Sequence, residues 1–139
     1  MTQADYEALA QLRYLLRCFM RFSEEKAEQA QLTHQQHQAL LALKGFPGGA
    51  QRATIGELAE RLQIRPHSAV GLVDRLVIQG LVRRESATSD RRQVFVSLSQ
   101  LGEARLESLS EVHRQELQRI GPEIGASLNR IMQDIPRRP

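Results

Sequence analysis

The sequence is poor in cysteine, aromatic residues and long apolar runs. Its 139 residues include one Cys and no Trp, and only 4% are aromatic. A single cysteine excludes an internal disulfide, and the low aromatic content argues against an all-β sandwich or barrel. No apolar run approaches the ~18 residues of a membrane-spanning helix. With 41% hydrophobic and 25% charged residues, the chain is expected to fold as one soluble domain rich in helices.

Signals for export and for catalysis are missing too. Residues 1–5 contain no basic segment followed by an apolar stretch, so we expect no signal peptide and a cytoplasmic protein. The glycine-containing segment 45–49 lacks the Lys and the Ser or Thr of a phosphate-binding loop. No nucleophile triad or pair of catalytic carboxylates is identifiable. We therefore expect neither an enzyme nor a cofactor.

Histidine and cysteine form no metal or redox pattern. His34 and His37 lie three residues apart, but a zinc site needs three or four ligands. We therefore expect the histidines to lie exposed on helix surfaces and to bind no metal. Cys18 has no second cysteine in the chain to resolve an oxidised form, so we expect a buried or inert thiol.

The first part of the chain has the pattern of two helices. Apolar residues recur with a helical period over residues 6–30. Thr33 and Gln36 have the spacing of a capping box, which predicts a second helix that ends at Gly45.

Two shorter helices, separated by a tight turn, are predicted next. Thr54 and Glu57 form another capping-box pattern. After a short break at residues 63–65, Pro66 occupies a favoured first-turn position, and Gly80 follows the end of the helix. We expect the second of these helices to bury Ala69, Val70, Val73, Leu76 and Val77. This is the layout of a helix-turn-helix.

A hairpin and two more helices are predicted in the rest of the chain. Residues 81–85 and 93–98 read as strands, and the polar turn between them completes a hairpin. A long helix begins at Ser99, Gly121–Pro122 is expected to break it, and a last amphipathic helix follows up to about residue 135. A hairpin that directly follows a helix-turn-helix is a wing.

The positive charge of the chain is concentrated in this central region. Of the 19 basic residues, only Lys26 and Lys44 are not Arg. Seven Arg against three acidic residues lie between Arg61 and Arg92, a local net charge of +4 in a chain whose total is +3. Such a local patch is the expected footprint of a site for a polyanion.

Three stretches of the chain carry known motifs of a winged helix-turn-helix: Thr54–Leu62, then Leu72–Leu76 with Gly80–Arg84, and Asp90–Ser99 followed by Gly102. Together they resemble the MarR family of bacterial transcription regulators, whose wing has an Asp-x-Arg signature. The resemblance extends over roughly residues 8–135.

This resemblance implies a fold that is mainly α with a small β-hairpin wing, and a single domain over residues 1–139. Residues 6–32 and 99–135 would be dimerisation helices, and residues 33–98 the winged helix-turn-helix lobe. It also implies a homodimer that binds a pseudo-palindromic double-stranded operator, with two recognition helices about one helical turn apart. Members of the family are commonly repressors that leave DNA when a small anionic, often phenolic, compound binds.

On that geometry the start of the fourth helix would enter the major groove. We expect His67 and Ser68 to contact base edges or phosphates, with Arg75 one turn deeper on a phosphate and supported by Asp74. Gly71 weakens direct readout, because it offers no side chain to the groove. The expected contacts from this helix are Arg65, Pro66, His67, Ser68, Gly71 and Arg75.

The wing is expected to supply the strongest single contact. Arg92 holds the last position of the Asp-x-Arg motif, and an Arg at a hairpin tip can enter a narrow minor groove, where the negative potential is concentrated. Asp90 would hold the wing or the guanidinium in place, and Arg91 would contact phosphate. Arg83 and Arg84 alternate faces of a strand, so at most one of them can point towards DNA.

An effector crevice would be lined by Arg17, Phe22 and His37. Two alternatives stay open: a constitutive DNA binder without ligand, and a winged-helix module whose basic face contacts an acidic protein.

Overall fold

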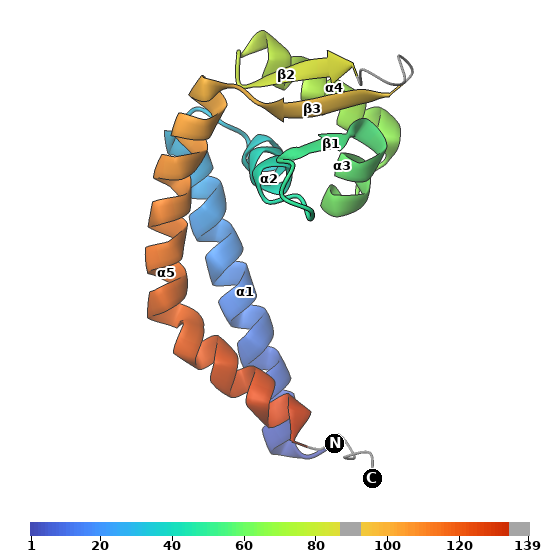
Figure 1. The fold of residues 1–139 in the computed structure, drawn as a ribbon. Helices are drawn as coiled ribbons and strands as arrows, with labels where there is room; N and C mark the ends of the chain where they lie inside the picture. Colours follow the sequence, from blue (N-terminus) through green and yellow to red (C-terminus); the bar gives the residue numbers. More distant parts are fainter. Residues whose placement is uncertain (87–92, 134–139) are drawn as a thin grey trace. The chain divides into compact units, whose positions relative to one another are not determined.

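The structure of the chain is a computed structural model, which describes residues 1–86 and 93–133. Five helices and three strands follow one another in these residues (Figure 1). Their order is α1 (Gln3–Gln29), α2 (His34–Lys44), β1 (Arg52–Thr54), α3 (Ile55–Leu62), α4 (Pro66–Ile78), β2 (Val82–Ser86), β3 (Val94–Leu98) and α5 (Gln100–Met132). The expected class, mainly helical with a small winged sheet, is confirmed.

The chain divides into two compact units. The helical unit comprises Met1–Lys26 and Ser110–Pro139, and the winged unit comprises Ala27–Leu109. The first therefore holds most of α1 and the C-terminal part of α5, and the second holds all the strands and α2 to α4.

The sheet of the winged unit has three antiparallel strands in the order β1-β3-β2. The sequence patterns predict only the hairpin of β2 and β3, because β1 is three residues long and too short for a detectable alternation. Val96, on the central strand, is fully buried, and its register partner on β1 is the equally buried Ala53. The two belong to an apolar core whose largest side chains are Leu40, Leu43, Leu58, Leu72, Leu76 and Leu81.

Both predicted capping boxes are present. Thr33 accepts from the backbone N–H of Gln36, whose side chain accepts from the backbone N–H of Thr33. Thr54 and Glu57 make the same reciprocal pair at the start of α3. Each box satisfies two backbone donors that the first helical turn leaves without intrahelical partners.

The predicted break at Gly121–Pro122 is wrong, because α5 continues through both residues. Proline lacks the N–H that would bond to the carbonyl four residues earlier, so it removes one hydrogen bond without ending the helix. The bonds on either side hold the segment helical, and Figure 1 shows α5 changing direction in its C-terminal half.

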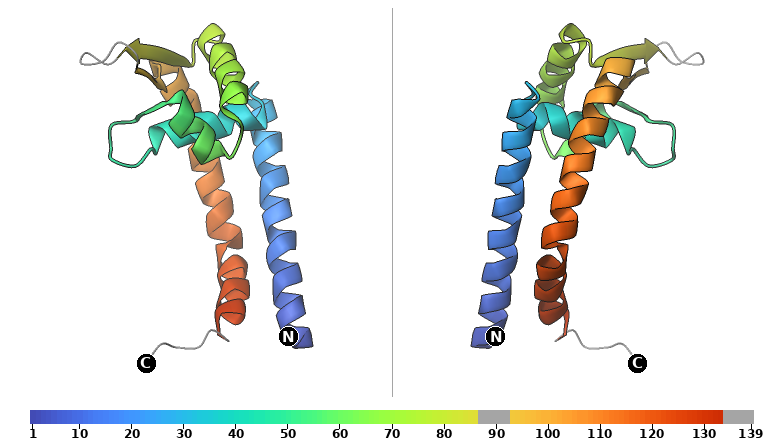
Figure 2. Two further views of the ribbon diagram at one scale, coloured as in Figure 1. Left: turned by 90° about the vertical axis from the view of Figure 1, so that its right-hand side faces the viewer. Right: turned by 90° about the vertical axis from the view of Figure 1, so that its left-hand side faces the viewer.

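In the helical unit α1 and α5 run antiparallel, and three polar contacts set their register. Ser23 Oγ lies 2.8 Å from His113 Nε2. Nearer the ends of the chain, Gln11 contacts Glu123 and Asp5 contacts Arg130. Figure 2 shows the two helices side by side. No described helix is both long and apolar enough to cross a membrane.

Two histidines lie inside their units, contrary to the expectation of exposed helix surfaces. The His113 ring contacts the rings of Phe19 and Phe22 edge to face, with centroids 5.8 and 5.5 Å away, and is 9% exposed. His37 is 2% exposed. Both positions lie on the inward face of an amphipathic helix, where an imidazole can bury its ring and keep a hydrogen bond.

Candidate nucleic-acid interface

The turn between α3 and α4 is short because one residue reverses the chain. Gln63 adopts a left-handed conformation with φ of 54°, which a residue other than glycine reaches at an energetic cost. Its side-chain amide donates to the backbone carbonyl of Glu60 at 2.7 Å, and the N–H of Ile64 donates to the carbonyl of Ala59 at 3.0 Å. These bonds fix the angle at which α4 leaves the turn.

The N-terminus of α4 differs from those of α2 and α3. Its N-cap residue is Arg65, which makes no side-chain capping bond, and its first turn contains no acidic residue. Pro66 occupies the first turn. Neither an acidic side chain nor a side-chain cap therefore compensates the positive end of the helix dipole. Such a helix start is suited to binding a phosphate.

The predicted contact residues of α4 gather on the exposed side of this helix start. Arg65, Pro66, His67, Ser68 and Arg75 are exposed, and Gly71 is half-buried. A Cβ added at Gly71 would lie 3.6 Å from Nη1 of Arg75. The Arg75 side chain therefore lies back over Gly71, towards the N-terminus of the helix.

The expected buried face of α4 needs one correction. Val70 is 42% exposed, whereas Leu72 is 1% exposed and belongs to the core. Ala69, Leu72, Val73 and Leu76 follow the spacing of one helical face. Val70 lies to one side of that face, so the expectation that it is buried with the other apolar residues of the helix is wrong.

The two arginines of β2 have different partners. Arg84 pairs with Asp74 of α4, and Arg83 Nε lies 3.4 Å from Glu85 Oε1. The expectation that Asp74 supports Arg75 is therefore replaced by a cross-link between α4 and β2. Successive side chains of a strand point to opposite faces of the sheet, so these neighbouring arginines pair with carboxylates on opposite faces.

The three predicted contacts of the wing, Asp90, Arg91 and Arg92, lie outside the described residues. The strands that lead into this segment are described: β2 and β3 pair from Val82 with Leu98 to Ser86 with Val94.

The residues expected to bind an effector belong to different units. Arg17 and Phe22 lie on α1 in the helical unit, where Lys26 Nζ sits 5.6 Å from the Phe22 ring centroid. His37 is buried in the winged unit. Cys18 is exposed rather than buried, and it hydrogen-bonds to Tyr14 and so raises the pKa of that phenol. Across the described ranges no three His, Cys, Asp or Glu side chains lie close enough together to hold a metal ion.

Comparison with known proteins agrees with this architecture. Residues 30–93 match the model of the MarR family. Two curated relatives from Bacillus subtilis (strain 168) are the transcriptional repressors YetL and MdtR. YetL is 34% identical over 68 residues and MdtR is 33% identical over 55 residues. These matches cover 49% and 40% of this chain, and only 41% and 36% of the respective relatives.

Solved structures share the fold over most of the chain. The transcriptional regulator PA4135 is 29% identical with a TM-score of 0.69, covering 92% of this chain and 97% of its own. NadR in complex with 4-hydroxyphenylacetate is 25% identical with a TM-score of 0.72, covering 88% and 84%. A mutant of S. aureus MepR bound to an oligodeoxyribonucleotide is 19% identical with a TM-score of 0.68, covering 94% and 98%. Residues 30–93 thus match the MarR family model, and the chain is similar to solved transcriptional regulators over most of its length.

Proposed function

We propose that the protein is a homodimeric, sequence-specific DNA-binding repressor, which places α4 in the major groove and the wing in the adjacent minor groove. The observation that carries this proposal is the start of α4, where exposed Arg65, His67 and Ser68 surround an uncapped helix end. A helix fits the major groove, and its N-terminal residues reach base edges while its dipole favours phosphate. A protein with this function works where the chromosome lies, in the bacterial cytoplasm.

Exposed apolar side chains on the helical unit support the homodimer. Large hydrophobic residues are at least 40% exposed along both helices, more than a small monomer usually leaves in water. Pairing two copies about a two-fold axis would cover them and present two recognition helices to a pseudo-palindromic site. These residues are Tyr6, Leu9, Tyr14, Leu16, Met20, Leu117, Leu128 and Met132.

The proposed role of the wing rests on its sequence. Arg92 would enter the minor groove, Asp90 would hold that guanidinium in place, and Arg91 would contact phosphate. The ladder of β2 and β3 supports this role, because it gives the segment between them a rigid base.

The proposed release by a small molecule rests on the family and on a structural neighbour. NadR, which this chain resembles, was solved with 4-hydroxyphenylacetate. An anionic or phenolic effector that binds one state more tightly would bias the protein between DNA-binding and released states.

Selection of duplexes from a random pool with the purified protein tests the proposal. The enriched site should be a pseudo-palindrome with half-sites about one helical turn apart. Fluorescence anisotropy on that site should then show at least about tenfold weaker binding for Arg65→Ala and for Arg92→Ala. Arg114→Ala is the matched control, because Arg114 lies in the helical unit and pairs with Glu111.

The dependence on salt separates DNA binding from protein binding. Affinity for duplex should fall steeply as salt is raised, because neutralised phosphates release counterions. Failure to enrich any duplex, or equal affinity for the three variants, would refute the proposal and favour a winged-helix module that contacts an acidic protein.

A further inference from the structure

A polar pocket of about 370 Å³ lies within the winged unit, on the side of the sheet that faces away from the apolar core. Its size falls in the range of sites for small ligands. Side chains from α2, from all three strands and from the first turn of α5 line it, together with the loop before β1. The residues that provide its charge and hydrogen-bonding groups are Lys44, Gln51, Arg52, Arg83, Glu85, Ser97 and Glu103.

Strand register places two guanidinium groups on either side of a hydroxyl group. Ser97 of β3 pairs with Arg52 on β1 and with Arg83 on β2. Residues in direct register point to the same face of a sheet. The centre of the pocket is therefore a row of two cations with a hydroxyl group between them.

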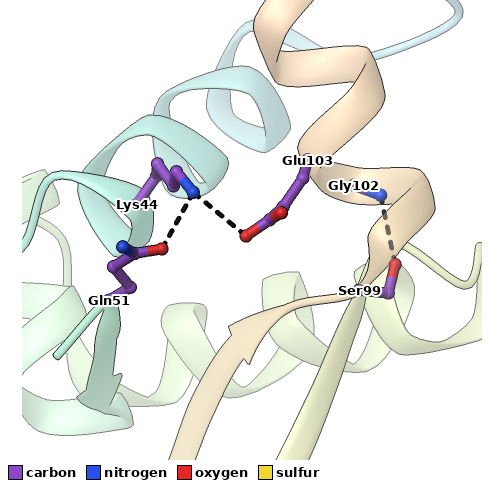
Figure 3. Close-up of polar contacts among 5 residues, drawn as sticks. All are labelled: Lys44, Gln51, Ser99, Gly102 and Glu103. Carbon is purple, nitrogen blue, oxygen red and sulfur yellow. Dashed lines mark hydrogen bonds and ion pairs between the residues drawn. The ribbon is translucent and has the colours of Figure 1, made fainter.

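Most of the charges in the pocket are already paired. Lys44 Nζ lies 2.8 Å from Gln51 Oε1 and 3.1 Å from Glu103 Oε1, and all three side chains point towards one another (Figure 3). Arg83 pairs with Glu85, whose carboxylate also accepts from the Ser97 hydroxyl at 3.5 Å.

Arg52 differs from the other two cations of the pocket, Lys44 and Arg83, in its contacts. Its guanidinium carbon lies 4.0 Å from the ring centroid of Phe95, a cation–π contact that fixes its position. In the part of the chain that the structure describes, no carboxylate lies within ion-pair distance of Arg52. The pocket thus holds three cations and two carboxylates, a net charge of +1.

The ligand that fits must be a monoanion with many hydrogen-bonding groups. We propose that this pocket binds a small hydroxylated monocarboxylate, with the carboxylate on Arg52. The hydroxyl groups of the ligand donate to Glu85 and Glu103 and accept from Lys44 and Arg83. Few apolar side chains line the pocket, so an aromatic acid would place its ring against charged and polar groups and gain little from burying it.

The pocket is linked to the wing by the two strands β2 and β3. Arg83 and Glu85 lie on β2 and Ser97 lies on β3, the two strands that flank residues 87–92. A ligand that bridges β1 and β2 would restrain the base of the wing. This consequence for DNA rests on the proposed function, whereas binding in the pocket does not.

Titration of the ¹⁵N-labelled full chain with gluconate, followed by amide NMR spectra, tests the binding. Glucose, which lacks the charge, and benzoate, which lacks the hydroxyl groups, are the comparison probes. We expect saturable gluconate shifts around Gln51, Arg52 and Ser97, with a Kd of about 1 mM or tighter. Arg52→Ala should weaken gluconate binding at least about tenfold, as for a lost charge-assisted hydrogen bond. Arg61→Ala is the matched control: its guanidinium also packs on a ring, 5.6 Å from the Phe46 centroid, but lies outside the pocket.

Three results would overturn the assignment: no saturable gluconate shifts in the winged unit, benzoate or glucose binding as tightly as gluconate, or equal gluconate affinity for Arg52→Ala and the wild type. The same spectra report whether each variant is folded. If gluconate binds but leaves duplex affinity unchanged, the pocket stands and only its link to the wing fails. A protein that binds no duplex but binds gluconate refutes the proposed function alone.

Discussion

Replacement of Gly102 by alanine should destabilise the winged unit strongly. Gly102 lies in the first turn of α5, and a Cβ added there would meet the backbone oxygen of Leu81 at 2.0 Å and its carbonyl carbon at 3.0 Å. Carbon and oxygen atoms normally pack more than about 3 Å apart, so the backbone would have to move by about 1 Å. Both residues are buried, so neither can move into solvent.

That movement would break the bonds which join α5 to the corner between α4 and β2. Ser99 N donates to Leu81 O at 3.0 Å, and Ser99 Oγ donates to Gly80 O at 2.6 Å. The same Ser99 hydroxyl accepts from Gly102 N at 3.1 Å, as Figure 3 shows. Overpacking costs about 1–3 kcal/mol, and each lost hydrogen bond costs about 0.5–1.5 kcal/mol. We therefore expect Gly102→Ala to lower the free energy of unfolding by about 2–5 kcal/mol.

Urea unfolding followed by circular dichroism measures this change, at one fixed protein concentration because association shifts apparent stability. Gly56→Ala is the matched control. Gly56 is a helical glycine of α3 in the same unit, and a Cβ there would meet nothing within 4 Å. The control should be neutral or more stable by about 0.5–1 kcal/mol, because alanine favours a helix. Equal unfolding free energies for the two variants would refute the close packing of Gly102 against Leu81.

Three further predictions concern single contacts. Thr54→Ala should cost about 1 kcal/mol of unfolding free energy, because it removes the side-chain cap of α3; an unchanged urea midpoint would contradict the capping box. A double-mutant cycle with Asp74→Ala and Arg84→Ala should give a coupling of about 0.2–1 kcal/mol, as for an exposed ion pair, and zero coupling would mean that the pair does not form in solution. Hydrogen bonds from Thr2 lower the pKa of the Asp5 carboxyl, so its contribution to stability is present above about pH 4 and is lost as pH falls through the lowered value. Carbon-detected NMR titration should show an Asp5 midpoint below that of an unfolded-peptide reference, and a midpoint at or above the reference would rule out those bonds.

Local signals allowed most of the winged unit to be predicted. The two capping boxes, Pro66 and Gly80 mark the helix ends within a residue or two, because each acts through bonds to its near neighbours in the chain. The sequence pattern does not predict the strand β1, because the contacts that stabilise it are non-local. Ala53 and its neighbours adopt an extended conformation only because they pair with β3, which lies more than 40 residues later in the chain.

The same distinction explains the errors at Pro122 and Asp74. Proline is a local signal against a helix, yet α5 continues through it. Asp74 could be placed on the exposed face of a helix from the sequence, but its partner could not, since Arg84 reaches it only after β2 has folded back onto α4. The pocket beside Arg52 escaped prediction for this reason too, because strand register alone brings Arg83 and Ser97 next to it.

The surface of α4 limits how many direct contacts with bases the helix could make. Gly71 has no side chain, and Arg75 covers the place where one would project. Base-specific contacts from this turn would then come from His67, Ser68 and the exposed Val70, a short set in which valine can contact only the methyl group of thymine. So few direct contacts would supply little of the specificity by themselves. Most discrimination would have to come from the spacing of two half-sites and from the shape of the minor groove proposed for the wing, which would make dimer geometry as important for recognition as the recognition helix itself.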